Sequence, residues 1–212
     1  MPIHLTKKKP DGSQIALWQM TESVDELLSL SDASEIVRAE VENFRSETRK
    51  KEWLTVRILL KDVLNVAHPD EIVYDEKGKP HLKNGNGHIS FSHTKNFAAI
   101  IFHPSRATGI DIETISKRIV KISQKFINDK EDEYIPYKKR IEALHIIWGV
   151  KEVLFKIYGK GGVDFKKHLH VYPFALSNEG TVDAEIKIEN TVLHFRINYF
   201  FRDGLVVVYG SQ

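Results

Sequence analysis

The chain has 212 residues, of which 42% are hydrophobic and 28% are charged, with a net charge of +2 and an isoelectric point near 8.6. This composition excludes a disordered chain and predicts a folded protein with a sizeable core. The basic excess is too small for a dedicated nucleic-acid binder, but it suits a phosphate-bearing ligand or an acidic partner. Because the chain has no cysteine, disulfides, thiolate catalysis and cysteine-ligated metals are excluded.

The N-terminal residues have no apolar segment typical of a secretory signal. The longest apolar runs, 97–102 and 205–209, are too short to span a bilayer and predict buried strands. We therefore expect a cytoplasmic protein without a membrane partner.

The first half of the chain predicts a strand, three helices and a group of strands. We expect the first strand over 15–20, followed by helices that start at Ser23, Ser34 and Ser46. The third helix, 46–65, has an apolar stripe with helical periodicity. A short strand is expected at 71–74, and further strands at 89–94, 97–102 and 108–113, separated by glycine-rich turns.

The second half repeats this order. A basic linker, 116–124, leads into short helices, and a long helix is expected from about 137 to 158, ending at Gly159. Strands are predicted at 169–174, 182–188, 192–201 and 205–209. The predicted fold is α/β (α+β), with two pseudo-symmetric halves, 1–114 and 115–212. Each half would pack a long helix on a small, mostly antiparallel sheet, with the active site in the cleft between the halves.

The segment Gly109-Ile110-Asp111-Ile112-Glu113 is the first candidate for chemistry. In a strand, Asp111 and Glu113 point to the same face. Two adjacent carboxylates repel each other unless a cation lies between them, and oxygen ligands favour Mg²⁺. An edge strand with its polar face in water is the alternative.

The long helix carries the second candidate, Trp148-Gly-Val-Lys151-Glu152 followed by Lys156. Apolar residues form one face of this helix, while Trp148, Glu152 and Lys156 lie on the opposite face. If that face is also buried, Glu152 needs a cation or a hydrogen-bond partner. A solvent-exposed Glu152–Lys156 pair is the alternative.

Three further positions could bind anions. Ser92 and His93 are neighbours in a strand and point to opposite faces, so they do not form a catalytic pair, but both can contact phosphate. Lys79 stands next to the rigid Pro80, and Arg57 lies within the third helix. The alternatives are a structural histidine and ordinary solvated charges.

The order and spacing of these residues resemble the 4'-phosphopantetheinyl transferases. The specific part is the pair of motifs G-x-D-x-E and W-x-x-K-E-x-x-x-K, and the match is to the long, pseudo-dimeric type that activates surfactin synthetase. The resemblance implies an enzyme that transfers 4'-phosphopantetheine from coenzyme A to a serine of an acyl or peptidyl carrier protein and releases 3',5'-ADP. Such carriers serve fatty-acid or secondary-metabolite synthesis.

The resemblance also implies residue roles. Asp111, Glu113 and Glu152 would bind Mg²⁺, or Mn²⁺, together with the pyrophosphate of coenzyme A, and Lys156 would neutralise charge there. Glu131 resembles a family glutamate that helps deprotonate the carrier serine. The coenzyme would be bound by a set of residues from both halves: Arg57, Lys79, Pro80, Ser92, His93, Asp111, Lys151 and Lys156.

The carrier should be acidic, and a basic stretch after the metal strand suits it: Lys117, Arg118, Lys121 and Lys125. An ordinary solvated helix face is the alternative. A cleft between two halves of one chain would let the protein act as a monomer. Two other functions stay open: a Mg²⁺-dependent nuclease or phosphohydrolase with the same acidic residues, and an inactive carrier- or nucleotide-binding module.

Overall fold

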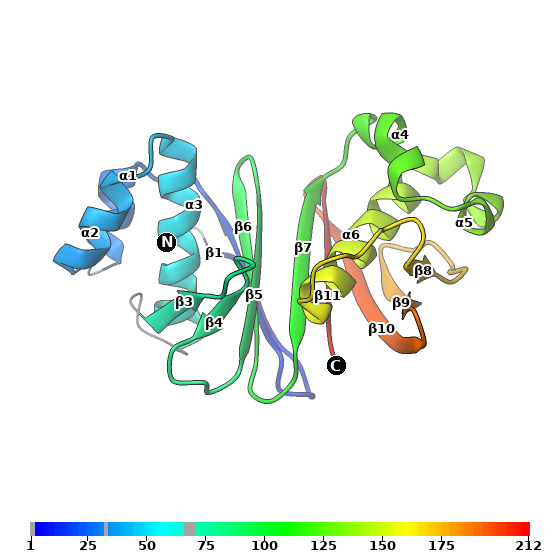
Figure 1. Cartoon of the computed structure of the whole chain (residues 1–212). Helices are drawn as coiled ribbons and strands as arrows, with labels where there is room; N and C mark the ends of the chain where they lie inside the picture. The colour runs from blue at the N-terminus through cyan, green and yellow to red at the C-terminus, as the bar shows by residue number, and fades with distance from the viewer. Residues whose placement is uncertain (1–2, 32–33, 66–70) are drawn as a thin grey trace. The chain divides into compact units, whose positions relative to one another are not determined.

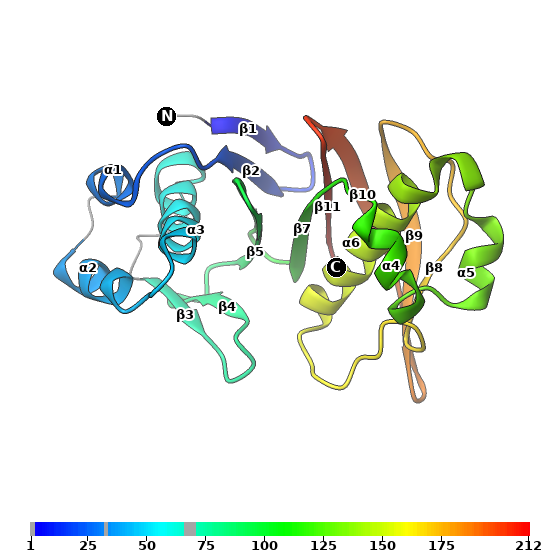
Figure 2. The same cartoon turned by 90° about the horizontal axis from the view of Figure 1, so that it is seen from above.

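The computed structural model describes residues 3–31, 34–65 and 71–212, and the chain divides into two compact units, Met1–Arg106 and Ala107–Gln212 (Figures 1 and 2). Each unit combines helices with an antiparallel sheet, so the predicted α+β class is confirmed. Among the helices in these ranges, none is long and apolar enough to cross a bilayer.

The elements of unit 1 follow the predicted order, with two additional strands. They are β1 (Ile3–Lys8), β2 (Gln14–Gln19), α1 (Val24–Leu30), α2 (Glu35–Glu42), α3 (Glu47–Ile58), a π-helical turn (Leu59–Val63), β3 (Ile72–Tyr74), β4 (Pro80–Leu82), β5 (His88–Thr94) and β6 (Phe97–His103).

The sheet of unit 1 has the order β1-β2-β6-β5, and β3 and β4 form a separate hairpin. Strand β1 was not predicted, because its lysine-rich sequence alternates only weakly; it forms a hairpin with β2 across Asp11-Gly12. The strands after the helices therefore do not form an independent meander. Strand β6 lies between β5 and the N-terminal hairpin. The residues 80–82, for which no strand was predicted, form β4.

All three helices of unit 1 begin at the predicted serines. The side-chain oxygens of Ser23, Ser34 and Ser46 accept hydrogen bonds from backbone N–H groups of the first helical turn, which stabilises each helix start. Helix α3 is buried through most of its second half and shares a core with the sheet, in which Leu54 and Ile100 are fully buried. The apolar stripe therefore correctly predicted the packing of this helix.

Unit 2 contains the second sheet and the long helix. Its elements are β7 (Thr108–Thr114), α4 (Arg118–Ile122), a 3₁₀ turn (Ser123–Lys125), α5 (Asp129–Tyr134), a second 3₁₀ turn (Tyr137–Lys139), α6 (Arg140–Tyr158), β8 (Leu169–Val171), β9 (Glu179–Ile188), β10 (Thr191–Arg202) and β11 (Leu205–Ser211). Helix α6 ends at Gly159, whose φ of 64° is the left-handed conformation that favours glycine.

The sheet of unit 2 has the order β7-β11-β10-β9-β8. Strand β7 pairs antiparallel with β11 along its whole length, so it belongs to unit 2 although it precedes the helices. The boundary between the units consequently falls after Arg106, earlier than the predicted position near Thr114. The boundary depends on strand pairing between distant segments, which local sequence patterns do not predict.

Helix α6 packs very closely on β7 and β11, and two glycines permit this approach. A Cβ atom at Gly109 would lie 2.7 Å from the backbone oxygen of Val153, and one at Gly149 would lie 2.5 Å from Cγ2 of Val208. Both distances are shorter than real carbon contacts, so a side chain at either position would force the helix and the sheet apart. The close packing of α6 on β7 therefore explains why the G-x-D-x-E motif begins with glycine.

We expect Gly109→Ala to lower the free energy of unfolding by ~1–3 kcal/mol, because the clash is with helix backbone and cannot be relieved by a rotamer change. Gly161→Ala is the matched control: a Cβ there would contact nothing within 4 Å, so the change should be close to neutral. Chemical denaturation of the two variants and the parent measures the difference. Equal stability of both variants would contradict the packing role of Gly109.

Candidate active site

Strand β7 and helix α6 bring together the acidic and basic residues that the motifs predicted. Asp111 is buried on β7, and its Oδ1 accepts a hydrogen bond of 2.8 Å from Nζ of Lys156 on α6. The same Nζ donates to the backbone oxygen of Ile110 at 2.8 Å. Two residues further along β7, Oε1 of Glu113 accepts from Nε1 of Trp148 at 3.1 Å. These contacts tie the charged face of α6 to the polar face of β7.

Glu152 completes this group, because its titration is coupled to both carboxylates of β7. Burial, followed by repulsion from Asp111, raises the pKa of Glu152 to about 7, with Glu113 adding to the increase and Lys156 opposing it. Burial and then Asp111 likewise raise the pKa of Glu113. Such coupling requires short distances between the charges. Glu152 is therefore electrostatically coupled to both carboxylates of β7.

A divalent cation is implied by the family resemblance, and the donor chemistry of the three carboxylates fits one. Their spacing in this structure does not yet form a ligand set: within residues 3–31, 34–65 and 71–212, no three acidic or histidine side chains lie close enough to hold a metal ion. Lys156 instead supplies the positive charge beside Asp111. Ligation would require the carboxylates to come closer than they stand here.

Lys151 and Glu131 form a buried ion pair beneath this face of α6. Both residues are fully buried, and Nζ of Lys151 donates to Oε2 of Glu131 at 2.7 Å and to the backbone oxygens of Phe126 and Phe165. Glu131 also accepts from the backbone N–H groups of Asn128, where it closes the capping box of α5, and of Val171. All three N–H donors of Lys151 and both carboxylate oxygens of Glu131 therefore have hydrogen-bond partners.

This arrangement argues against two roles taken from the family resemblance. Glu131 was expected to act as a catalytic base and Lys151 to contact the coenzyme. A carboxylate with no exposed surface, bound to an ammonium group and two N–H donors, has no position from which to accept a proton from a substrate. We therefore assign both residues a structural role, which joins α5, α6 and β8.

In unit 1, Arg57 is buried rather than presented at the surface. Its guanidinium stacks on the Trp53 ring, 3.2 Å from the centroid, and Nη1 donates to the backbone oxygen of Trp53. Burial lowers the pKa of Arg57. Nε is buried without a hydrogen-bond partner among the described residues. An unsatisfied buried donor is costly, and an oxygen of an anionic ligand would satisfy it.

His93 is held by two residues of α3 that were not predicted from the sequence. Its Nδ1 lies 3.0 Å from Oε1 of Glu52, and its Nε2 lies 3.1 Å from Nη1 of Arg49. Ser92, the preceding residue of β5, is half-buried. The contacts of His93 with Glu52 and Arg49 could not be predicted from the sequence, because α3 and β5 are far apart along the chain and no spacing rule relates them.

Lys79 and Pro80 lie at the turn between β3 and β4. Asp75 organises this turn, because its Oδ1 accepts from the backbone N–H groups of Lys77 and Lys79 at 2.9 Å each. Gly78 has a φ of 78°, which a β-carbon would strain. Burial lowers the pKa of the Lys79 ammonium, while Asp75 opposes that effect. Lys79 is therefore partly desolvated.

Comparison with known proteins fits this geometry. A sequence profile of the 4'-phosphopantetheinyl transferase superfamily matches residues 107–206, which include both motifs. The 4'-phosphopantetheinyl transferase gsp of Aneurinibacillus migulanus is 32% identical over 115 residues, which are 51% of this chain and 46% of that protein. Residues 107–206 of this chain belong to the 4'-phosphopantetheinyl transferase superfamily. The family predicted from the motifs is thereby confirmed.

The two sequence matches each cover only part of this chain. The alignment with the Aneurinibacillus migulanus protein spans about half of its length, so the match does not include the whole relative. Among solved structures, a chain of the caspase-8/p35 complex aligns with 97% of this chain and 66% of its own length, at 8% identity. Its TM-score of 0.16 is too low to indicate a shared fold.

The basic stretch of this family member lies on the surface of unit 2. Lys117, Arg118, Lys121 and Lys125 are all exposed, on α4 and the 3₁₀ turn that follows it. Two apolar side chains of the same helix, Val120 and Ile122, are also exposed, at 42% and 39%. A short amphipathic helix that exposes both charges and apolar groups is suited to a protein partner.

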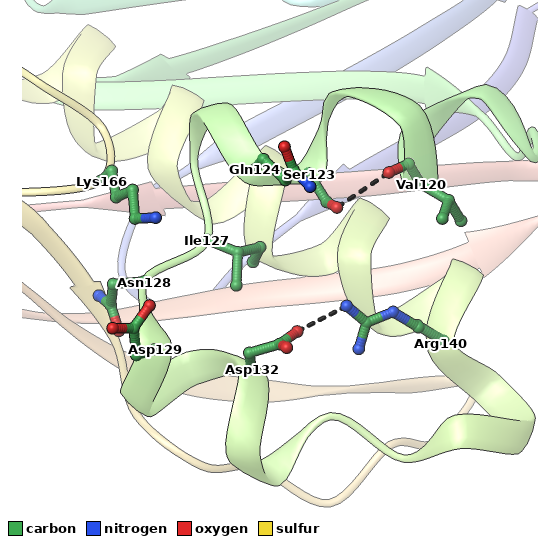
Figure 3. A pocket seen from close by; sticks show the side chains of 9 residues that line it. All are labelled: Val120, Ser123, Gln124, Ile127, Asn128, Asp129, Asp132, Arg140 and Lys166. Carbon is green, nitrogen blue, oxygen red and sulfur yellow. Dashed lines mark hydrogen bonds and ion pairs between the residues drawn. The ribbon is translucent and has the colours of Figure 1, made fainter.

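A cavity of about 320 Å³ adjoins this stretch (Figure 3). It lies between α4, α5 and the start of α6, and Arg140 and Asp132 form an ion pair at its wall. Its other lining residues are Val120, Ser123, Gln124, Ile127, Asn128, Asp129 and Lys166. Local sequence patterns do not predict this cavity, because its walls come from separate elements.

The raised pKa of Glu152 has a consequence for stability. The carboxyl has an ordinary value of 4.5, so below that pH it is protonated in both the folded and unfolded states and carries no penalty. As the pH rises through about 7, the carboxyl must ionise in its buried site, and the folded state loses the stability that it has at low pH relative to the unfolded state. Glu152→Gln should therefore raise the free energy of unfolding at pH 8, by up to about 3 kcal/mol, and leave it unchanged near pH 4.

Denaturation at both pH values in metal-free buffer tests this expectation. The control is Glu179→Gln, which removes an exposed carboxylate of the same unit and should have little effect at either pH. A Glu152→Gln variant that is less stable than the parent at pH 8 would refute the electrostatic coupling.

The structural role assigned to Glu131 makes the opposite prediction. Glu131→Gln leaves the Lys151 ammonium buried without its counter-charge, and burial already lowers the pKa of that lysine. We expect a loss of ~3–5 kcal/mol of stability. Glu133→Gln, at an exposed position of the same helix, should change stability by less than about 0.5 kcal/mol. Unaltered stability of Glu131→Gln, accompanied by lost activity, would restore the catalytic assignment.

Proposed function

We propose that this chain transfers the 4'-phosphopantetheine arm of coenzyme A to a serine of an apo carrier protein, with release of 3',5'-ADP. The observation that supports the proposal most directly is the group formed by Asp111, Glu113 and Glu152 beside Lys156. It lies within the residues that match the superfamily. The fold alone would not support a function, but this group of side chains has a chemistry suited to a diphosphate that binds together with a divalent cation.

Lys156 is the cation that the structure places among these carboxylates. Its ammonium group is half-buried and bound to Asp111, so its position is fixed before any ligand binds. In the proposed reaction, the serine oxygen forms a bond to the β-phosphorus of coenzyme A as the bond to the 3',5'-ADP oxygen breaks. Lys156 would stabilise the negative charge that accumulates on the phosphate oxygens, and a preorganised donor contributes more than a mobile one.

Glu152 is the best candidate for accepting the serine proton. A general base is most effective when its pKa lies near the working pH, and burial together with Asp111 raises the pKa of Glu152 to about 7. Glu131 is the weaker candidate because it is enclosed in its ion pair with Lys151. If Asp111, Glu113 and Glu152 instead hold a divalent cation, Mg²⁺ or Mn²⁺, the cation would neutralise the diphosphate of the coenzyme and lower the pKa of Glu152, which would then act as a ligand.

Residues of unit 1 would bind the coenzyme through its phosphates. Arg57 supports this role by its unsatisfied buried Nε, and Lys79 by its partial desolvation next to the rigid Pro80. His93 and Ser92 are the remaining candidates, at the end of β5. A phosphate monoester carries close to two negative charges at neutral pH and binds most strongly to several such donors together.

The carrier would dock on the basic stretch of α4. Four exposed cations of that stretch attract an acidic protein over several ångströms, and the exposed side chains of Val120 and Ile122 offer apolar contact once it is bound. The cavity beside Val120 could receive a side chain of the partner. Electrostatic attraction of this kind weakens with salt, so transfer should slow as ionic strength rises.

Mass spectrometry of an apo carrier protein incubated with coenzyme A, Mg²⁺ and this protein tests the proposal. The carrier should gain one phosphopantetheine group, and EDTA should prevent the gain. Glu152→Gln should reduce the rate at least about 100-fold, which is typical for loss of a general base. Glu133→Gln, an exposed change on α5, should retain the parental rate.

Contrary outcomes distinguish the alternatives. Carriers of fatty-acid, polyketide and peptide synthesis that all stay unmodified, while coenzyme A still binds, would indicate a binding module instead of a transferase. Cleavage of nucleic acid or phosphate esters by the same preparation would favour a hydrolase. The structure offers that reaction little support, because Glu131, in the acidic segment 129–133 that would supply further ligands, is enclosed in its ion pair with Lys151.

A further inference from the structure

A buried histidine of the long helix holds the segment between β7 and α4. His145 lies on α6 and is 3% exposed, and its Nε2 accepts a hydrogen bond of 3.0 Å from the backbone N–H of Ser116. Ser116 lies two residues after the end of β7 at Thr114 and two before the start of α4 at Arg118. The contact therefore joins α6 to the point where the strand of the acidic residues leads into the basic stretch.

Ser116 uses each of its polar groups at this junction. Its N–H donates to His145, and its Oγ accepts from the backbone N–H of Arg118 at 3.2 Å. Its backbone oxygen accepts from the N–H of Ile119 at 3.3 Å. Because the last two bonds lie in the first turn of α4, a displacement of Ser116 would move the start of this helix with it.

Helix α4 depends on such contacts for its position, because it is short. It has five residues, of which Ile119 is buried, and it packs against α6 (Figure 2). A helix of this length is not stable in isolation, so tertiary contacts set its geometry. Ile119 fixes the middle of the helix in the core, and Ser116, held by His145, fixes its entry.

The contact also determines the tautomer of His145. Nε2 lies 3.2 Å from the backbone oxygen of Ser116 as well, but that oxygen already accepts from Ile119. Within the described ranges the N–H of Ser116 has no other acceptor, and buried N–H groups are rarely left unpaired, so Nε2 is the acceptor and Nδ1 carries the proton. Burial lowers the pKa of His145, which favours this neutral ring, while Ser116, Glu142 and Asp111 oppose the shift.

We propose that His145 is a positioning residue for the carrier protein: through Ser116 it fixes α4, and with it the basic stretch, before the carrier docks. The inference rests on the proposed function. A docking surface that is already ordered loses less conformational entropy when its partner binds. Without the contact, α4 would populate several positions, and the carrier would bind only a fraction of the molecules tightly. His145 does not touch the reacting atoms, so the chemical step would stay the same.

Hydrogen exchange measured by mass spectrometry tests the hold of His145 on α4 without any ligand. His145→Leu removes the acceptor, and residues 116–125 should then exchange about 10-fold faster or more, as expected for a lost hydrogen bond. His145→Gln can place its amide oxygen near the former position of Nε2 and should restore most of the protection. Exchange of this segment that is equal in the parent and in His145→Leu would overturn the proposal.

Ile197→Val is the matched control for a general loss of stability. Ile197 is fully buried on β10 in the same core, so its shortening destabilises the unit without changing the junction at Ser116. We expect it to leave the exchange of residues 116–125 at the parental rate. Faster exchange there in Ile197→Val, equal to that of His145→Leu, would show a nonspecific effect and refute the assignment.

Steady-state transfer from coenzyme A to an acidic apo carrier tests the docking role. His145→Leu should raise KM for the carrier about 10-fold and change kcat and KM for coenzyme A less than about 2-fold, because a loss of binding alone raises KM. His145→Gln and Ile197→Val should stay close to the parent. A fall in kcat with an unchanged KM for the carrier would overturn the docking role.

The two experiments separate this inference from the proposed function. An active transferase in which His145→Leu leaves KM for the carrier unchanged would refute the inference alone. A parent protein that modifies no carrier would refute the proposed transfer and the docking role together. The exchange rates would still decide whether His145 holds α4, because that measurement needs neither coenzyme nor carrier.

Discussion

The close contact between helix α6 and strand β7 is the constraint on which the candidate site depends. Gly109 and Gly149 leave no side chain between helix and sheet, so the backbones approach within contact distance. At that separation Lys156 reaches both Ile110 and Asp111, and Glu152 comes within electrostatic range of the carboxylates on β7. A larger residue at either glycine would increase the distances on which these interactions depend. The two glycines therefore influence the candidate site by setting the distance between α6 and the sheet.

The same contact explains why two lysines of one helix have different roles. Lys151 is enclosed by one carboxylate and two backbone oxygens, which satisfy each of its donors. Burial raises the pKa values of Glu113 and Glu152, and Asp111 adds to the increase because Lys156 lies among more carboxylates than it can neutralise. A satisfied pair stabilises the fold, whereas an excess of negative charge is a cost to stability that a bound cation would relieve. From this difference in local charge we infer a functional role for Lys156 and a structural role for Lys151.

Unit 1 uses a buried acid in another way. Glu52 is less exposed than Arg49 and His93 and contacts both. The acid is itself nearly inaccessible, so its effect on a ligand is exerted through the groups that it holds. Arg57, stacked on Trp53, is likewise fixed before any ligand binds. Rigid basic groups lose little conformational entropy on binding an anion, which favours affinity.

The sequence by itself determined the family and most of the elements. Serine caps, apolar periodicity and glycine turns are local signals, so the three capped helices of unit 1, the end of α6 at Gly159 and the hairpins of β9–β11 were predictable. The two motifs also predicted that β7 and α6 would bring charged side chains together, as Asp111 and Lys156 show, because regular elements fix which side chains share a face. Only the tertiary structure decided the rest. The pairing of β7 with β11, the burial of Glu131 with Lys151 and the support of His93 by Glu52 are contacts between distant segments. Burial and charge neutralisation depend on the neighbours that the fold supplies, and those neighbours are not written in local sequence.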